Sequence, residues 1–455
     1  MKVFGSSGTR GVANETLTPD FVLRVAQAAG TLWRADRVAV GRDTRRTGRM
    51  FGNAAASGLA SVGADVDRLG VVPTPALQSY AEAEGVPGVM ITASHNPPAY
   101  NGVKLVGADG IELPVDRLER IEEIFLGEKS EPVAWDRTGA DRSVDGINRR
   151  YVEQLLDAVD RERIAGADLH IALDPGHGAG ALCSPEFFRR LGCSVVTVNA
   201  QPDGHFPGRA PEPVRENLGD LGRLVEATDA DVGVAHDGDA DRAVFFDETG
   251  SYVEGDAALA ALAESELSAG DTTVSAVNVS QRLVDVAERV GASVELTSIG
   301  STRIMTRIRE LRDAGETVPV AGEGNGGIIF PQYRMNRDGA YTAARFLSLL
   351  VDRTASEVIA PFDDYENVRI NIEYENEAER AALIDAAAAT ADAQSGTVTT
   401  IDGYRVDYGD AWVLARPSGT EPVIRIYAES ADGDRARHLA NTFKEALEAA
   451  KSEIA

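Results

Sequence analysis

The sequence predicts an α/β protein with three related α/β domains, whose sheets are mixed and largely parallel, and a C-terminal α+β domain, all around one central cleft. The 455 residues are enough for about three or four domains with a core each. Short β-branched runs alternate with longer helical patterns through most of the chain, which is typical of α/β domains. Four apolar runs end abruptly in small polar clusters, and ligands of open α/β sheets bind beyond the carboxyl ends of strands.

The first domain is expected over residues 1–145. Thr18, Pro19 and Asp20 suit the N-cap, the first helical position and the first turn, which predicts a helix through about Trp33. Further elements expected here are strands at 38–40 and 88–92 and a helix at 50–62.

The second domain is expected over residues 146–248 and the third over 249–362, with the turn-rich segment 247–250 at their junction. In the second domain we expect strands at 170–173, 194–198 and 231–235, and helices near Glu186 and at 218–228. In the third we expect strands at 272–276, 293–296 and 318–321, and helices at 281–289 and 302–314.

The pattern changes around residues 361–364, so the last domain is expected over 363–455. It shows a strand, an alanine-rich helix at 377–393, several short strands and a closing amphipathic helix. This order is typical of an α+β domain.

The net charge excludes some classes of partner. Asp and Glu number 72 against 45 Lys and Arg, for a formal charge of −27, which disfavours nonspecific binding to nucleic acid or an anionic membrane. No stretch approaches about 18 apolar residues, and the start is rich in Gly and Ser, so we expect a cytoplasmic protein. Two cysteines, Cys183 and Cys193, are too few for a disulfide scaffold and are expected to be reduced apolar fillers.

The basic residues are strongly biased toward arginine. Five are lysine, which leaves 40 arginines beside a large excess of carboxylates. Concentrated salt screens charges to about 3 Å at 1 M and would let such a surface persist. The composition therefore suggests a halophilic protein from a salt-rich cytoplasm.

The sharpest cluster follows the run 232–235 and places carboxylates at alternate positions: Asp237, Asp239 and Asp241. Three such oxygens in a Gly- and Ala-containing loop suit a hard divalent cation, Mg²⁺ first. An acidic surface turn is one alternative. An EF-hand is another, because Glu248 would occupy its twelfth position, but the sixth must be Gly and is Arg242 here.

A second cluster, Thr-Ala-Ser-His-Asn-Pro at 92–97, contains Ser94 beside His95. Most serines in such a place cap turns, and neighbouring side chains need not face each other. A phosphoryl group on Ser94, however, would complete the shell of a cation held by three aspartates.

Two cationic residues are candidates for catalytic roles beside Ser94. Lys104 is a lysine in a chain that otherwise uses arginine, and a lysine, unlike an arginine, can act as a general acid or base. An exposed lysine is the plain alternative. Arg10 lies in a glycine-rich turn that either presents it to phosphate or belongs to a mobile amino terminus.

Two further clusters suit a sugar phosphate. Glu323 and Asn325 lie between glycines and offer the paired donors and acceptors that a polyhydroxylated sugar needs, although a glycine-rich hairpin is the alternative. The segment 416–420 gathers a guanidinium, two hydroxyls and free backbone N–H groups into a possible phosphate nest, or an ordinary loop: Arg416, Ser418, Gly419 and Thr420. The glycine-rich segment 174–180 lacks dinucleotide-loop spacing and is interpreted as a structural turn.

Together the clusters at 92–97, 237–242, 322–327 and 416–422 resemble the four signature loops of the α-D-phosphohexomutase superfamily, in its order and across the whole chain. The resemblance implies a phosphoserine at Ser94, with His95 beside it, and one Mg²⁺ held by Ser94, Asp237, Asp239 and Asp241. It implies that Lys104, Arg10 and His95 are catalytic, Lys104 and Arg10 by assisting proton transfer and charge stabilisation. It also implies that Arg242 supports the metal loop and binds substrate. Sugar hydroxyls would contact Glu323 and Asn325, and the nonreacting phosphate would bind Arg416, Ser418, Gly419 and Thr420.

The reaction implied is an isomerisation that moves phosphate between C6 and C1 of a hexose through a hexose 1,6-bisphosphate, which also activates the enzyme. The substrate would be a small hexose or hexosamine phosphate, and the protein a monomer or homodimer. The loop at 322–327, with Phe330-Pro331 and Arg337-Asp338-Gly339 after it, is most similar to archaeal-type phosphoglucosamine mutases, so glucosamine phosphate is the first expectation.

Phosphomannomutase or phosphoglucomutase activity is the alternative, although Asn325 and Gly327 replace the Ser and His of the common bacterial loop. A metal-dependent sugar phosphatase and a silent sugar-phosphate binding protein are remoter possibilities.

Overall fold

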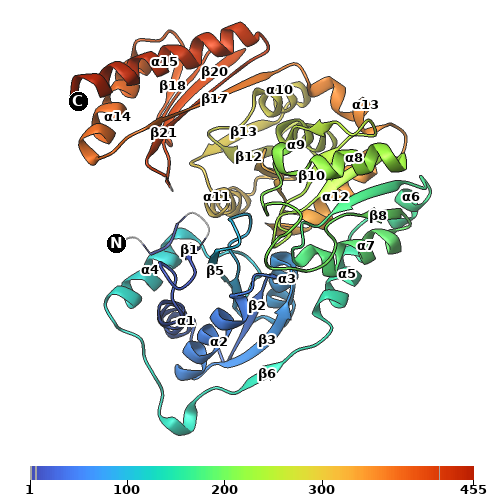
Figure 1. Cartoon of the computed structure of the whole chain (residues 1–455), viewed down its shortest axis with the longest axis vertical. Helices are drawn as coiled ribbons and strands as arrows, with labels where there is room; N and C mark the ends of the chain where they lie inside the picture. Colours follow the sequence, from blue (N-terminus) through green and yellow to red (C-terminus); the bar gives the residue numbers. More distant parts are fainter. Residues whose placement is uncertain (1–2, 6–7, 420, 455) are drawn as a thin grey trace.

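The computed structural model describes residues 3–5, 8–419 and 421–454. Four sheets follow one another along the chain, from the blue end of Figure 1 at the bottom, through green and yellow, to red at the upper left. Three of them mix parallel and antiparallel pairs, and the fourth is antiparallel throughout. The predicted fold class is confirmed.

The first sheet has the strand order β1-β5-β4-β2-β3-β6. The N-cap predicted at Thr18 is present, because its hydroxyl accepts a hydrogen bond from the backbone N–H of Phe21. The elements are β1 (Thr9–Val12), α1 (Pro19–Trp33), β2 (Arg37–Arg42), α2 (Gly48–Ser61), β3 (Asp65–Val71), α3 (Thr74–Glu84), β4 (Gly88–Ile91), β5 (Tyr100–Val106), α4 (Val115–Leu126), the 3₁₀ turn η1 (Trp135–Arg137) and β6 (Asp141–Ser143).

The second sheet has the order β11-β10-β9-β7-β8. Its elements are α5 (Ile147–Asp157), α6 (Arg161–Ala165), β7 (His170–Asp174), η2 (Ala179–Leu182), α7 (Ser184–Leu191), β8 (Ser194–Thr197), η3 (Arg215–Asn217), α8 (Gly219–Thr228), β9 (Val232–Ala235), β10 (Val244–Phe246) and β11 (Tyr252–Val253).

The third sheet has the order β13-β12-β14-β15-β16. The strand expected at 318–321 begins only at Ala321, because Pro319 cannot donate to a strand ladder. The elements are α9 (Gly255–Glu266), β12 (Thr272–Ala276), α10 (Gln281–Val290), β13 (Ser293–Thr297), α11 (Ser301–Asp313), β14 (Ala321–Glu323), β15 (Gly327–Phe330), β16 (Arg334–Arg337), α12 (Gly339–Leu349), α13 (Ala355–Ile359) and η4 (Ala360–Phe362).

The fourth sheet has the order β17-β21-β20-β19-β18 and carries two helices. Its elements are β17 (Glu366–Glu373), α14 (Glu377–Asp392), β18 (Thr397–Thr399), β19 (Tyr404–Asp407), β20 (Ala411–Pro417), β21 (Val423–Ser430) and α15 (Gly433–Ile454).

The first three sheets share one local plan. In each, a strand paired in parallel with its neighbour (β4, β9 or β14) is followed by an antiparallel strand (β5, β10 or β15). The connections between these pairs span 92–99, 236–243 and 324–326. Three of the four polar clusters singled out in the sequence therefore occupy equivalent places in three related sheets.

One large core joins the first three sheets. It includes Leu77 from α3, Phe187 from α7 and Phe346 from α12, and Phe346 stacks on Phe245 of β10 at 4.1 Å between ring centroids. The fourth sheet has a separate core around Phe443. The three equivalent loops are thus held on one packed body.

Neither cysteine forms a disulfide, and both are buried. Burial raises the pKa of the Cys193 thiol to about 12, as expected for a reduced filler. Among residues 3–5, 8–419 and 421–454, no helix is long and apolar enough to cross a membrane.

Candidate active site

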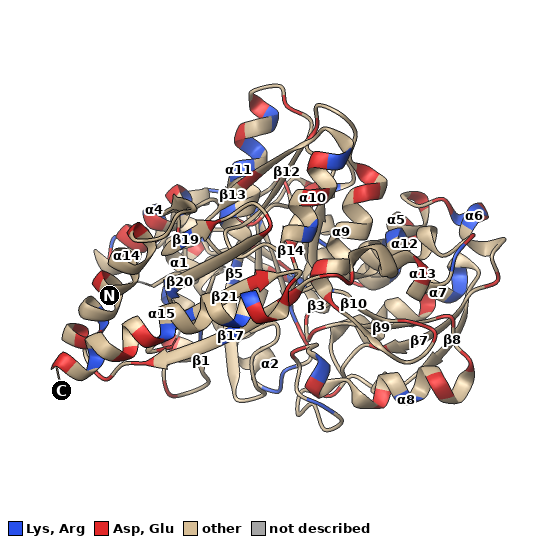
Figure 2. Cartoon of the chain, turned by 90° about the horizontal axis from the view of Figure 1, so that it is seen from above, with Lys and Arg blue, Asp and Glu red and all other residues tan. Residues whose placement is uncertain are grey.

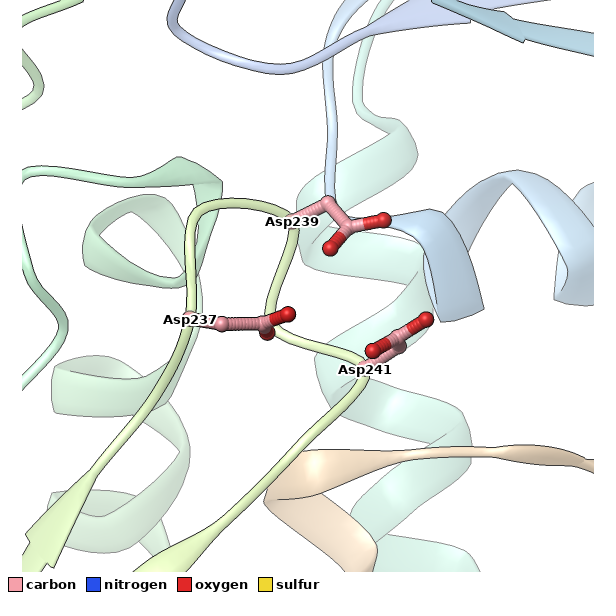
Figure 3. A group of neighbouring side chains, drawn as sticks. All are labelled: Asp237, Asp239 and Asp241. Atoms are coloured by element: carbon pink, nitrogen blue, oxygen red, sulfur yellow. The ribbon is translucent and has the colours of Figure 1, made fainter. Parts of the chain in front are cut away.

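The loop between β9 and β10 gathers three carboxylates around one point (Figure 3). One oxygen from each of Asp237, Asp239 and Asp241 lies within 4.8 Å of the others, and all three residues are buried. The Oδ1 atom of each is buried without a hydrogen-bond partner. Burial, with repulsion from Asp241 and Asp239, raises the pKa of Asp237 to about 7. Three orphaned hard oxygens are what a divalent cation such as Mg²⁺ would satisfy, so the donor set fits that ion.

Ser94 lies directly on this cluster. Its side chain is buried, and its Oγ donates a hydrogen bond of 2.6 Å to Oδ2 of Asp237. The close approach of the two loops requires Gly238, because a Cβ there would lie 2.6 Å from the carbonyl oxygen of Ser94. His95 also faces Ser94, with Nδ1 3.3 Å from Oγ. Repulsion from Arg242, then burial and Arg10, lowers the pKa of His95, so its ring is neutral.

Lys104 comes from β5 and is 1% exposed, which excludes the exposed-lysine alternative. Its Nζ lies 2.7 Å from Oδ2 of Asp239 and 2.9 Å from Oδ2 of Asp241. Burial acts to lower the pKa of Lys104, but the two carboxylates outweigh it and raise the pKa, so the amine is a cation. These contacts leave the Oδ1 atoms of both aspartates for a metal ion.

Arg10 and Arg242 approach the same cluster from two sheets. Arg10 is on β1, and its Nη1 donates to Oδ1 of Asn96 at 2.7 Å. Burial, then repulsion from Arg242, lowers the pKa of Arg10. The Nε of Arg242 lies 3.7 Å from Oδ2 of Asp237. Guanidinium groups gathered here suit a phosphoryl group on Ser94.

The loop at 322–327 opens into a cavity of about 720 Å³ that also reaches Arg242 in the loop between β9 and β10. Glu323, Asn325 and Arg242 line it together. The Oδ1 of Asn325 accepts the backbone N–H of Gly327 at 3.0 Å. From the fourth sheet, Asn367, Arg369 and Tyr427 line the same cavity, so it is a cleft between domains.

Among the described residues, the segment 416–419 at the end of β20 lines no part of this cleft. Arg416 forms an ion pair of 3.2 Å with Asp402 of its own domain, and Ser418 accepts the backbone N–H of Glu421 through Oγ. Space is open around Gly419. Thr420 lies outside the described residues.

Two residues of the centre were missed by sequence reasoning. Arg337 donates from Nη2 to Oδ2 of Asp241 at 2.6 Å, and Thr74 donates from Oγ1 to Oδ2 of Asp239 at 2.5 Å. Burial acts to raise the pKa of Asp241, but Arg337 and Lys104 outweigh it and lower that pKa. In the sequence, Arg337 belongs to a segment that only resembles a family motif and has no assigned role. Thr74 lies between Pro73 and Pro75 at the start of α3, and no motif there indicates a contact with the carboxylates.

Family models match almost the whole chain. They describe phosphoglucomutase/phosphomannomutase α/β/α domain I over residues 1–132, domain II over 149–250, domain III over 254–365 and the C-terminal domain over 370–446.

Curated relatives and a solved structure agree with these models. A "Probable phosphoglucosamine mutase" of Methanopyrus kandleri is 41% identical, over 100% of this chain and 99% of that one. A "Phosphoglucomutase/phosphomannomutase" of Thermococcus kodakarensis is 40% identical over 96% of each chain. The crystal structure of a phosphoglucomutase/phosphomannomutase family protein from Burkholderia thailandensis has a TM-score of 0.85 at 29% identity, over 99% of this chain and 98% of the other.

Proposed function

The chain belongs to the phosphoglucomutase/phosphomannomutase family of isomerases, and from that premise we propose that it interconverts glucosamine 6-phosphate and glucosamine 1-phosphate. One observation carries the assignment of the reacting group: Oγ of Ser94 is 2.6 Å from a carboxylate of the cluster that suits Mg²⁺. A hydroxyl in that place can carry a phosphoryl group whose charge the cation offsets.

In the proposed reaction, the bond between phosphorus and Oγ of Ser94 breaks as the free hydroxyl of the sugar bonds to phosphorus. The resulting 1,6-bisphosphate turns around, and its other phosphate returns to Ser94. Mg²⁺, held by Ser94, Asp237, Asp239 and Asp241, would supply charge neutralisation. Lys104 and Arg10 stabilise the migrating charge. Lys104, a cation between Asp239 and Asp241, gives its proton to the departing oxygen and takes up the proton that the attacking sugar hydroxyl loses.

The remaining residues are proposed to hold the sugar. Glu323 and Asn325, which line the cleft with Arg242, bind sugar hydroxyls. Arg416, Ser418, Gly419 and Thr420 bind the nonreacting phosphate. Because residues 416–419 line no part of the cleft in this structure, we infer that the fourth domain closes over the bound sugar, which brings them to it and excludes water.

The choice of sugar rests on relatives and on the loop at 322–327. Several archaeal relatives carry the name phosphoglucosamine mutase, which supports glucosamine phosphate. A relative named phosphoglucomutase/phosphomannomutase at 40% identity supports mannose or glucose phosphate as the second candidate.

We also propose that the domains end at residues 145, 248 and 362, that the protein is a monomer or homodimer, that it is cytoplasmic and that it is adapted to salt.

The deciding experiment is phosphorus NMR of the protein with Mg²⁺, a hexose 1,6-bisphosphate and glucosamine-, mannose- or glucose-6-phosphate in turn. A 1-phosphate signal identifies a mutase and its sugar, whereas inorganic phosphate alone would indicate a phosphatase. Ser94→Ala should abolish turnover. Ser79→Ala is the matched control, because Ser79 is also buried but bonds Gln154 away from the cleft.

A further inference from the structure

Ser94 has an unusual backbone conformation. Its φ angle is +51°, in the left-handed region that residues other than glycine seldom occupy. Such a conformation persists where its surroundings hold it, and it is found often at functional sites. Oγ reaches the metal loop from this conformation, so whatever holds the backbone of Ser94 also places its hydroxyl.

Both backbone polar groups of Ser94 are held by one hydrogen-bonded ring. The N–H of Ser94 donates to Oγ1 of Thr92 at 2.8 Å, and this hydroxyl donates to Oδ2 of Asp43 at 2.7 Å. The same Oδ2 accepts from Nε of Arg45 at 3.0 Å. Nη2 of Arg45 closes the ring on the carbonyl oxygen of Ser94 at 2.8 Å. All four residues are at most 1% exposed.

Arg45 holds the rest of the loop as well. Its guanidinium donates to the carbonyl oxygens of Asn96 at 2.6 Å, Pro97 at 2.7 Å and Tyr100 at 3.0 Å. With Ser94, four backbone acceptors of one loop bind one side chain. An arginine offers five donors in a fixed planar fork, which a lysine does not.

The residues of this hydrogen-bonded ring come from the ends of two paired strands and also contact the second domain. Asp43 and Arg45 follow β2, which pairs in parallel with β4, and Thr92 follows β4. On the other side, the guanidinium of Arg45 lies 5.2 Å from the ring centroid of Phe206 in the second domain. The hydrogen-bonded ring of Asp43, Arg45, Thr92 and Ser94 therefore lies where the loop at 92–99 meets the second domain, which carries the three aspartates.

We propose that Asp43, Arg45 and Thr92 are positioning residues for the phosphoryl transfer, and that their ring keeps Oγ of Ser94 on the metal loop through both halves of the reaction. This inference rests on the proposed role of Ser94. The hydrogen-bond partners of Oγ are Asp237 and His95 and none of these three side chains, so the three act through the backbone of Ser94 and leave binding of the sugar largely unchanged.

The sharpest test removes one hydroxyl. Thr92→Val keeps the shape of the side chain but takes away both hydrogen bonds of the hydroxyl, and Thr92→Ser restores them. Because a small misplacement of a reacting group can reduce rate on the order of 100-fold, we expect kcat of T92V to fall by about 10- to 100-fold. KM for the sugar phosphate should stay within about threefold, and T92S should recover most of kcat.

The matched control is Thr273→Val. Thr273 is likewise fully buried, in β12, and its hydroxyl makes one internal hydrogen bond, to the carbonyl oxygen of Val320 at 2.9 Å, where the hydroxyl of Thr92 makes two. T273V should lose stability as T92V does but keep kcat. Arg45→Lys is the second variant: it keeps the charge, loses the fork and should lower kcat with KM unchanged.

Intact-protein mass spectrometry with site mapping follows phosphorylation of Ser94 by hexose 1,6-bisphosphate in each variant. Slower phosphorylation of T92V in parallel with its kcat supports the proposal. If T92V keeps the wild-type kcat, or if T273V loses as much kcat as T92V, the positioning role is wrong while the proposed function still stands. Phosphate on another residue of the wild-type protein would overturn the proposed function and this inference together.

Discussion

At the scale of single residues, Lys104 shows how burial and charge define a role. It is a cation inside a strand, stable there because two carboxylates accept its hydrogen bonds. Lys104→Arg would keep the positive charge but could not release a proton. We expect kcat to fall by about 10²- to 10⁴-fold, the usual contribution of general acid–base catalysis.

The control for this variant is Lys129→Arg, since Lys129 is exposed at the surface of the first domain. Circular dichroism should show both variants folded, and the mutase assay should show a loss for K104R only. If K104R kept the wild-type kcat, Lys104 would contribute positive charge only and would not transfer a proton.

Asp256 gives a prediction about pH. Burial, then repulsion from Glu429, raises its pKa from 3.8 to about 6. Between those values the folded state binds more protons than the unfolded state, so this group's contribution to stability is lost as pH rises through the window from 3.8 to 6. Each pKa unit corresponds to about 1.4 kcal/mol.

Asp256→Asn removes the free-energy cost of ionising this buried carboxyl group. We expect the free energy of unfolding to rise by about 1–3 kcal/mol at pH 8 and to change little at pH 4. Thermal unfolding of both proteins at the two pH values measures the difference. A gain of equal size at pH 4 would show that the effect is not one of ionisation.

At the scale of elements, one buried carboxylate links the third and fourth domains at the start of α10. Glu429 of β21 is fully buried, and its Oε1 accepts from Oγ of Ser280 at 2.9 Å and from the backbone N–H of Gln281 at 2.6 Å. It therefore caps α10 from another domain. The indole N–H of Trp412 also donates to it, at 3.3 Å.

Glu429→Ala would leave several buried donors without an acceptor. We expect a loss of about 3–5 kcal/mol, typical for removing one partner of a buried charged network. Glu429→Gln, which keeps an acceptor oxygen, should lose less. Hydrogen exchange should rise at α10 and β21 and stay unchanged at β7 and β9, and a uniform rise over the whole chain would argue against a local junction.

Elements also show what the sequence could and could not predict. Most parallel strands and their helices were predicted because their apolar runs are continuous. β5 was missed, since a buried lysine interrupts its pattern and only Asp239 and Asp241, more than a hundred residues away, make that burial possible. Arg45 was missed for the same kind of reason: its partners are backbone carbonyls, which no sequence motif reveals.

At the scale of the whole molecule, the site depends on equivalence among domains. Three loops at matching places in three sheets supply Ser94, the three aspartates and the residues proposed to bind the sugar, and a shared core fixes them. Motif order in the sequence predicted the set of loops. It could not predict that residues 416–419 line no part of the cleft in this structure, because the fourth domain has its own core and no local pattern encodes its placement.

The surface charge provides the last prediction. Positions of Asp and Glu, red along the ribbon in Figure 2, occur over all four domains, in keeping with 72 Asp and Glu against 45 Lys and Arg. At low ionic strength these like charges repel one another and favour the expanded, unfolded chain. Because the screening length falls from about 10 Å at 0.1 M to about 3 Å at 1 M, we expect Tm to rise steadily with KCl over this range.

Two salts separate charge screening from other effects of salt. Chloride screens without strongly strengthening apolar burial, whereas sulfate does both, so most of the rise in Tm should already occur in KCl. Replacing exposed aspartates of α14, such as Asp385 and Asp392, by asparagine should reduce the dependence on KCl, because fewer like charges then need screening. A Tm that is flat from 0.1 to about 2 M KCl would mean that ion pairs already balance the acidic surface, and the proposed adaptation to salt would be wrong.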